Sequence, residues 1–87
     1  MITITYTDRF KKHYQKLTEK EKDAFKTKFK QFVADPTIPS LRIKKVQGTK
    51  GLFEFSVNMD IRVIWHYEGE ELVILVDIGH HDILKQY

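Results

Sequence analysis

A cluster of titratable side chains, His80, His81 and Asp82, follows directly after a long apolar run in this sequence. Histidine can give and take protons near neutral pH, because its unperturbed pKa is about 6.5. The apolar run predicts a buried central strand, and the end of such a strand is a place where fixed side chains meet a substrate. We therefore treat the cluster as a candidate proton-transfer site. The competing interpretation is a polar surface turn, which is the more common origin of such a cluster.

Arg62 is another candidate for a chemical role, since it lies inside a predicted strand between apolar neighbours. A guanidinium group stays charged, and its planar fork matches two phosphate oxygens at once. Glu54, on the preceding predicted strand, can instead form an internal ion pair with it, which is the more common role of a strand arginine. The residues alone leave both roles open.

A metal centre is the weaker interpretation of the histidines. Two adjacent histidines point in different directions, and no further ligand spacing accompanies them. The sequence has no cysteine, which excludes disulfides and thiolate metal sites. We therefore expect no metal and no cofactor, and we place His13 on the surface of a helix.

Three antiparallel strands are expected to position these residues. Apolar and polar residues alternate in the first two predicted strands, 53–57 and 61–67. The third, 72–78, is apolar at almost every position, as in a strand buried on both faces. Short polar segments at 58–60 and 68–70 are the predicted turns.

Gly79 is expected to end the third strand, and residues 83–87 are expected to add a final helical turn. Tyr87 lies six residues after His81, close enough for that turn to bring its ring back to the same pocket. A terminal aromatic residue is otherwise commonly frayed.

The first half of the chain predicts one strand and two helices. Residues 2–6 alternate between apolar residues and threonine, as in a half-buried strand. A short amphipathic helix follows over residues 8–17. Thr18 and Glu21 have the spacing of a capping box, which begins a second helix. Pro36 ends it, because proline disfavours a helical residue before it.

The predicted order is therefore β-α-α-β-β-β, an α+β fold in which a helix hairpin packs on one face of a small, mainly antiparallel sheet. The first strand is expected to pair beside a later strand. The other face of the sheet is left for chemistry or for a partner.

Residues 36–50 are predicted to form a basic connection ahead of the sheet. Its positive side chains are candidate contacts for RNA phosphates, as point charges. An ordinary solvated loop is the alternative. These side chains are Arg42, Lys44, Lys45 and Lys50.

Charge is divided unevenly along the chain. Residues 1–50 hold thirteen Lys and Arg against five Asp and Glu, whereas residues 51–87 hold two against seven. A basic half of this kind suits a polyanion such as nucleic acid. A lysine-rich solvated surface is the competing interpretation.

Size and composition indicate one globular domain spanning residues 1–87 with a single core. The content of 41% hydrophobic and 31% charged residues is typical of a folded chain rather than a disordered one. The first residues lack the pattern of a signal peptide. The longest apolar run falls far short of the roughly 20 residues that a membrane span needs. We expect a soluble cytoplasmic protein with no membrane partner.

With these elements in this order, the chain resembles the RelE/ParE superfamily of small bacterial toxins from toxin–antitoxin pairs, over essentially its whole length. The most specific part is a succession of features: aromatic-x-x-x-Val, a short turn, Arg-Val-Ile-aromatic, an acidic turn, an apolar strand, and Gly followed by basic residues. In this sequence they are Phe53 to Val57, Asn58 to Asp60, Arg62 to Trp65, Glu68 to Glu71, Leu72 to Ile78, and Gly79-His80-His81.

The resemblance is to the ribonuclease branch of RelE, YoeB and YafQ, whose members cut messenger RNA in the ribosomal A site. It implies that Arg62 holds the scissile phosphate. His81 matches a position after the last strand that is Arg in RelE-like and His in YafQ-like members. Tyr87 matches the C-terminal tyrosine of RelE-like members, and Asp60 an acidic residue before the third strand in YafQ-like members.

Two positions depart from these relatives. RelE-like members place lysines where this sequence has Glu54 and Ser56, and YafQ-like members place a histidine at Ser56. The site is therefore expected to be less positive than in either group.

The implied chemistry is attack of the RNA 2′-hydroxyl on the neighbouring phosphorus, without a metal. Arg62 stabilises the added negative charge. His81 takes one proton-transfer role, with Asp60 or Glu54 as its counterpart, and Tyr87 stacks on a base or holds a proton. The general base and the general acid are not assigned separately.

Two alternatives stay open. A ParE-like toxin shares the fold and blocks DNA gyrase by protein contact, in which case Arg62 is structural. A catalytically weak relative mainly binds its antitoxin. Every version predicts an antitoxin partner with an acidic or amphipathic segment. The nuclease version adds the ribosome and its messenger RNA, and the ParE-like version adds gyrase.

Overall fold

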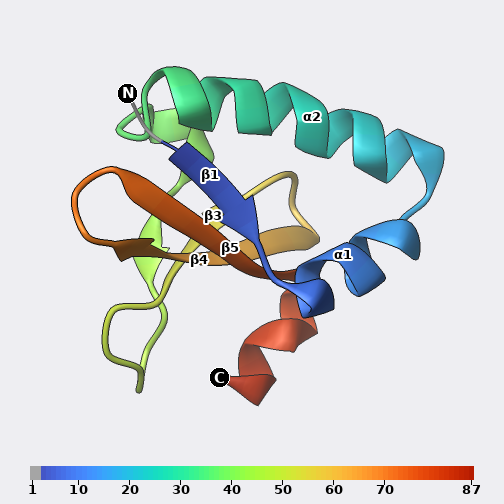
Figure 1. Ribbon diagram of the computed structural model, residues 1–87. Coiled ribbons are helices and arrows are strands. Elements are labelled where there is room, and N and C mark those ends of the chain that lie inside the picture. Colours follow the sequence, from blue (N-terminus) through green and yellow to red (C-terminus); the bar gives the residue numbers. More distant parts are fainter. Residues whose placement is uncertain (1–2) are drawn as a thin grey trace.

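A five-stranded sheet organises the computed structural model, which describes residues 3–87, with His81 described by its backbone alone (Figure 1). The strands lie in the order β1-β5-β4-β3-β2. The predicted α+β fold class is confirmed. Along the chain the elements are β1 (Thr3–Tyr6), α1 (Asp8–Gln15), α2 (Glu19–Ala34), the 3₁₀ turn η1 (Pro39–Leu41), β2 (Lys44–Lys45), β3 (Phe53–Ser56), β4 (Ile61–Glu68), β5 (Leu72–His80) and the 3₁₀ turn η2 (His81–Gln86).

The first strand pairs with the last. β1 runs parallel to β5, with Thr3 opposite Leu72 and Tyr6 opposite Leu75. The other neighbouring strands are antiparallel. A parallel pair needs a long crossover connection, which the helices and the intervening strands supply here. The prediction that the first strand pairs beside a later one is confirmed.

Local signals set where the helices begin and end. The Thr7 hydroxyl accepts a hydrogen bond from the backbone N–H of Phe10 and caps α1. Thr18 and Glu21 form the predicted capping box at the start of α2. Asp35 has an extended backbone ahead of Pro36 and ends α2.

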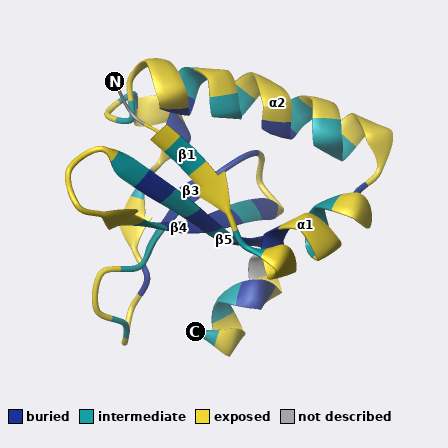
Figure 2. Ribbon diagram, in the orientation of Figure 1, coloured by how far each residue is buried: buried dark blue, intermediate teal, exposed yellow. Residues whose placement is uncertain are grey.

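The main core lies between the helices and one face of the sheet. Phe32 of α2 is fully buried and stacks on Phe55 of β3, at 4.9 Å between ring centroids. Its ring also meets Trp65 of β4 edge-on at 4.9 Å. Aromatic pairs of this geometry add to the burial of apolar area that holds the layers together. The exposed outer surface of α2 and the buried centre of the sheet are both visible in Figure 2.

The opposite face of the sheet is not left open as predicted. Ile64 of β4 is fully buried there and packs with Val46 and Ile83 in a second apolar cluster. Ile83 belongs to η2, which therefore covers part of the face that the helices do not reach. In Figure 1 this final turn lies on the other side of the sheet from α2.

The segment 36–50 is not the plain loop that was predicted. It contains η1 and the edge strand β2, in which Lys44 pairs with Glu54 and Lys45 with Phe53. The sequence pattern missed β2, because two adjacent lysines show no alternation of apolar and polar residues. The strand forms by pairing with β3.

Gly79 does not end the third strand, which is a correction of the prediction. β5 continues to His80, and Gly79 pairs with Arg62. A Cβ atom at Gly79 would lie 2.6 Å from Cγ2 of Ile83. Glycine is therefore needed here for the close approach of η2 to the sheet, not for a break in the strand. No helix among the described residues is long and apolar enough to cross a membrane.

Candidate functional site

Arg62 and Glu54 lie together on the sheet face opposite the helices. Arg62 Nε is 3.8 Å from Glu54 Oε1, and both side chains are nearly buried, at 13% and 11% exposure. Register places Ser56 opposite Arg62 and Glu54 opposite Ile64, so the two charged residues are diagonal neighbours. The internal ion pair anticipated for a structural arginine is therefore present.

The guanidinium of Arg62 is also anchored by the turn before β4. Its Nη1 donates to the backbone carbonyl of Asn58 at 2.7 Å and to that of Ile61 at 3.2 Å. The Asn58 side chain in turn accepts from the backbone N–H groups of Asp60 and Ile61. This arrangement holds one charged group in a fixed place, as the recognition of a phosphate requires.

A groove of about 400 Å³ opens beside this pair, between β2, β3 and η2. Three lysines line it together with Glu54: Lys44, Lys45 and Lys85. The first two were predicted as phosphate contacts. Lys85 was missed, because nothing in its local sequence indicates that η2 folds back beside β2. The groove thus brings cations from two elements next to the carboxylate that pairs with Arg62.

The remaining predicted site residues are dispersed. Arg42 has a left-handed backbone (φ 53°) and lines a separate hollow near Ser56 and Asn58. Lys50 is exposed in the loop before β3, and Asp60 is exposed in the turn before β4. Among the predicted residues, Glu54 therefore contacts Arg62, and Lys44 and Lys45 share a groove with Glu54. Arg42, Lys50 and Asp60 lie outside that groove.

His81 lies outside the described side chains. Its backbone begins η2 directly after His80, which pairs with Ile61 at the end of β5. The backbone of His81 therefore lies just beyond the sheet, two residues after Gly79, the register partner of Arg62. Its role stays a prediction.

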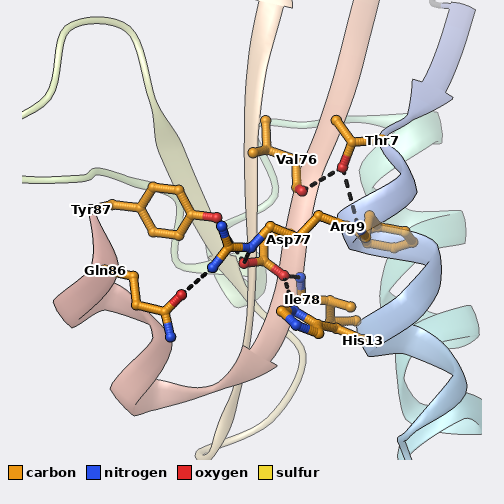
Figure 3. Close-up of polar contacts among 9 residues, drawn as sticks. Thr7, Arg9, His13, Val76, Asp77, Ile78, Gln86 and Tyr87 are labelled. Carbon is orange, nitrogen blue, oxygen red and sulfur yellow. Dashed lines mark hydrogen bonds and ion pairs between the residues drawn. The ribbon is translucent and has the colours of Figure 1, made fainter.

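A buried carboxylate lies at the junction of α1, β5 and η2. Asp77 is 0% exposed, inside the apolar run of β5. Its Oδ1 accepts from the backbone N–H of Ile78 at 2.8 Å and lies 2.5 Å from His13 Nδ1. Its Oδ2 accepts from the Tyr87 hydroxyl at 2.7 Å and is 3.1 Å from Arg9 Nε. Figure 3 shows these groups converging from three elements.

Two further contacts join α1 to η2 around this carboxylate. Arg9 Nη2 donates to the side-chain oxygen of Gln86, and its guanidinium lies 5.7 Å from the ring centroid of Tyr87. We call Asp77 with Arg9, His13, Gln86 and Tyr87 the Asp77 network. A buried carboxylate is tolerated only when it is well paired, and these donors supply the pairing.

The sequence interpretation missed this network and was wrong about His13. That residue is not a free surface histidine, since its ring is only 28% exposed and contacts Asp77. Two signals were available in the sequence. Asp77 is the one charged residue in an apolar run, and Arg9 and His13 are spaced four apart, on one face of a helix.

The environment of Tyr87 bears on its predicted role. Burial, together with the hydrogen bond to Asp77 and the charge of that carboxylate, raises the pKa of Tyr87 to about 12. The nearby Arg9 guanidinium opposes this shift. The hydroxyl therefore holds its proton firmly near neutral pH, which favours a stacking or positioning role over proton transfer.

No group of three or more His, Asp or Glu side chains among the described residues is arranged to hold a metal ion. The arrangement can bind an anion at Arg62 and the lysine groove, and it can position an imidazole and a phenol around Asp77.

Comparison with solved structures shows a shared fold. The crystal structure of YafQ from Escherichia coli strain BL21(DE3) superposes with a TM-score of 0.78 at 17% identity, covering 97% of this chain and 98% of that chain. The E. coli DinJ–YafQ toxin–antitoxin complex gives a TM-score of 0.75 at 18% identity, covering 95% and 96%. The intact E. coli RelBE toxin–antitoxin complex gives 0.70 at 17% identity, covering 91% and 95%. At these identities the likeness concerns the fold.

Comparison at the sequence level identifies the family. No curated protein sequence matches the chain. Residues 4–84 match the family described as the ParE toxin of the type II toxin–antitoxin system parDE. Because this match covers nearly the whole sequence and the shared fold agrees with it, the chain belongs to the ParE toxin family of type II toxin–antitoxin systems, within the RelE/ParE superfamily.

Proposed function

We propose that this toxin is a ribosome-dependent endoribonuclease, which cleaves messenger RNA in the ribosomal A site by attack of the 2′-hydroxyl on phosphorus. The observation that carries the proposal is the placement of Arg62. Two backbone carbonyls anchor its guanidinium on a sheet face, next to a groove lined by three lysines. A fixed cation of this kind stabilises the negative charge that develops on a phosphate during attack.

The lysines of the groove offset the absence of basic residues at Glu54 and Ser56, where the resemblance to RelE-like toxins implies lysines. Lys44 lies directly opposite Glu54 in the sheet, and Lys85 approaches from η2. In this proposal, neighbouring elements supply the cations that the resemblance to RelE-like toxins implies on β3. Lysines in such a groove would hold the phosphates on either side of the scissile bond as point charges.

Proton transfer is proposed for His81, which follows β5 directly, with Glu54 or Asp60 as its counterpart. Glu54 has the better position, because it already lies beside Arg62, whereas Asp60 is exposed in the turn. Tyr87 is proposed to position η2 or to stack on a base, since its hydroxyl is committed to Asp77.

A cognate antitoxin is the proposed partner. The YafQ and RelE structures that share this fold include complexes with the antitoxins DinJ and RelB. We expect a small protein whose acidic or amphipathic segment covers part of the basic surface of this toxin. The ribosome and its messenger RNA are the proposed targets.

The proposal is tested by inducing the toxin alone in bacteria and mapping the 5′ ends of messenger RNA. Arg62→Ala and His81→Ala are compared with His66→Ala, a matched histidine control outside the site whose ring contacts the carbonyl of Tyr67. We expect new ends within translated regions for the wild type and for His66→Ala, and at least a hundredfold fewer in the two site variants. Equal cleavage by Arg62→Ala would refute the proposal.

Inhibition of DNA gyrase by protein contact is the second candidate function. Two observations favour it: the family match names ParE, and Arg62 has an internal partner in Glu54. Under this alternative, growth stops with DNA breaks or a replication block and without new messenger RNA ends. Purified toxin would then inhibit supercoiling by gyrase, and Arg62→Ala would retain that inhibition if it folds.

A further inference from the structure

A second groove, of about 260 Å³, lies between α1 and η2. Its polar lining comes from His13 of α1, Lys16 at the C-terminal cap of α1, His80 of β5, and Asp82 and Gln86 of η2. It is distinct from the lysine groove, because η2 presents Lys85 to that groove and Gln86 to this one. Two of its residues, His80 and Asp82, belong to the cluster that the sequence predicted as a proton-transfer site, whereas His13, Lys16 and Gln86 were not predicted as site residues.

The ring of His13 has a fixed orientation in this groove. Nδ1 lies 2.5 Å from Asp77 Oδ1, so the neutral ring carries its proton on Nδ1 and donates it to the carboxylate. Among the described residues no other polar partner is recorded for the ring, which leaves Nε2 for a ligand. A buried carboxylate that holds Nδ1 and stabilises the imidazolium is the arrangement found in enzymes that use histidine as a general base.

Pairing of Asp77 does not by itself require a histidine. Arg9 neutralises its charge, and Tyr87 and the backbone N–H of Ile78 supply further donors. His13 adds to the Asp77 network a group that is partly exposed, at 28%, and able to exchange a proton. The network therefore resembles a general base held by an orienting carboxylate, rather than a set of contacts that only joins α1 to β5 and η2.

Charges from every neighbouring element surround the imidazole. Arg9 of α1 and Lys16 at its C-terminal cap are positive, and Glu21 of α2 lies 3.6 Å from His80. Asp77 of β5 and Asp82 of η2 are the acidic groups, with Tyr87 next to Asp77. Lys16 lines the groove and can hold the phosphate of a nucleotide whose hydroxyl reaches Nε2, whereas Arg9 is committed to Asp77 and Gln86.

The groove adjoins the proposed phosphate site. Gly79 lines it and is the register partner of Arg62 in the next strand. Paired residues in antiparallel strands have Cα atoms about 4.5–5.5 Å apart. One wall of this groove, at Gly79, is therefore one strand away from Arg62.

We propose that His13 is a catalytic residue of this toxin, acting as general base on single-stranded RNA, with Asp77 as its positioning residue. The inference rests on the proposed nuclease function. Nε2 takes the proton of the 2′-hydroxyl as the 2′ oxygen forms a bond to phosphorus. The bond from phosphorus to the 5′ oxygen breaks, and the 5′ oxygen takes a proton from His81. His13 then has the counterpart role that was proposed above for Glu54 or Asp60. The products are a 2′,3′-cyclic phosphate and a 5′-hydroxyl.

The test uses the purified full-length protein, with ribosomes programmed with a reporter messenger RNA. Cleavage rates are measured against pH for the wild type, His13→Gln, Asp77→Asn and the control His66→Gln, after circular dichroism has confirmed folding. We expect His13→Gln to lower the rate about 10²–10⁴-fold with little change in KM, as for the loss of a general base. The rise of the wild-type rate with pH should disappear in His13→Gln. His66→Gln should cleave within about twofold of the wild type.

A second measurement separates failure of this inference from failure of the nuclease proposal. The imidazole nitrogen resonances of the labelled protein are followed while a 2′-O-methyl RNA oligonucleotide, which cannot be cleaved, is added. A selective shift of His13 Nε2, with His66 unmoved, supports contact between the groove and RNA even if no cleavage is found. If Arg62→Ala abolishes cleavage while folded His13→Gln cleaves as the wild type does, the nuclease proposal stands and His13 has only a structural role, in joining α1 to β5. An unmoved His13 resonance also overturns the inference.

Discussion

The hydroxyl of Tyr87 donates a 2.7 Å hydrogen bond to Asp77, a carboxylate that is completely buried in the central part of β5. The same carboxylate contacts Arg9 and His13 of α1. One side chain thus ties the first helix, the last strand and the final turn together. Since η2 carries His81 and Lys85, the Asp77 network also sets the position of two residues of the proposed site.

Asp77→Asn should destabilise the fold for two reasons. In the wild type the surrounding donors share two carboxylate oxygens, whereas the amide offers them one acceptor oxygen. The variant also loses the ion pair with Arg9. We expect a loss of about 2–3 kcal/mol in the free energy of unfolding, moderated by the partial exposure of Arg9 and His13. Urea unfolding at neutral pH measures it. Asp23→Asn, an exposed change on α2, should stay within about 0.5 kcal/mol of the wild type. Equal stability of the two variants would show that the network contributes nothing net.

The raised pKa of Tyr87 predicts a loss of stability at high pH. The folded state holds the phenolic proton more tightly than the unfolded state, in which the pKa is near 10.0. The stabilisation is therefore fully present below pH 10 and is lost as the pH rises towards about 12. Urea unfolding of the wild type and Tyr87→Phe should differ below pH 10 and converge towards pH 12. A constant difference across this range would contradict the assigned hydrogen bond.

Gly79→Ala should force η2 away from the sheet, because the new Cβ would lie 2.6 Å from Cγ2 of Ile83. We expect a cost of about 1–3 kcal/mol. The double variant with Ile83→Ala removes the clashing methyl group, so its cost should be smaller than the sum of the single costs by about 0.5–3 kcal/mol. Thermal and urea unfolding of the four proteins complete the cycle. Additive costs would mean that η2 already moves freely at Gly79.

Lys85→Gln should weaken binding of single-stranded RNA and reduce its salt dependence. Each lysine that neutralises a phosphate adds about 0.7 to the slope of log affinity against log salt concentration. Fluorescence anisotropy with a labelled oligonucleotide at several salt concentrations gives this slope. Lys20→Gln, an exposed change at the start of α2, serves as the matched control. An unchanged slope for Lys85→Gln would remove the lysine groove from the RNA contact surface.

Features that depend on near neighbours were readable from the sequence. The capping box of Thr18 and Glu21 and the stop at Pro36 follow from hydrogen bonds and steric effects within a few residues. Alternation of apolar and polar residues predicted the three consecutive strands of the second half. It also suggested that Glu54 can reach Arg62, because the two strands are joined by a short turn that limits their register.

The sequence by itself therefore determined the order of the two helices and of four of the five strands, both ends of α2, and the family. Only the tertiary structure decided which distant groups meet. Arg9, Asp77 and Tyr87 belong to elements far apart in the chain, and no local pattern specifies that a parallel β1–β5 pair brings α1 over the last turn. β2 exists because β3 offers it a hydrogen-bonding edge, and Lys85 joins the lysine groove because η2 packs on Ile64. These contacts follow from long-range packing, in which burial of apolar area selects the partners.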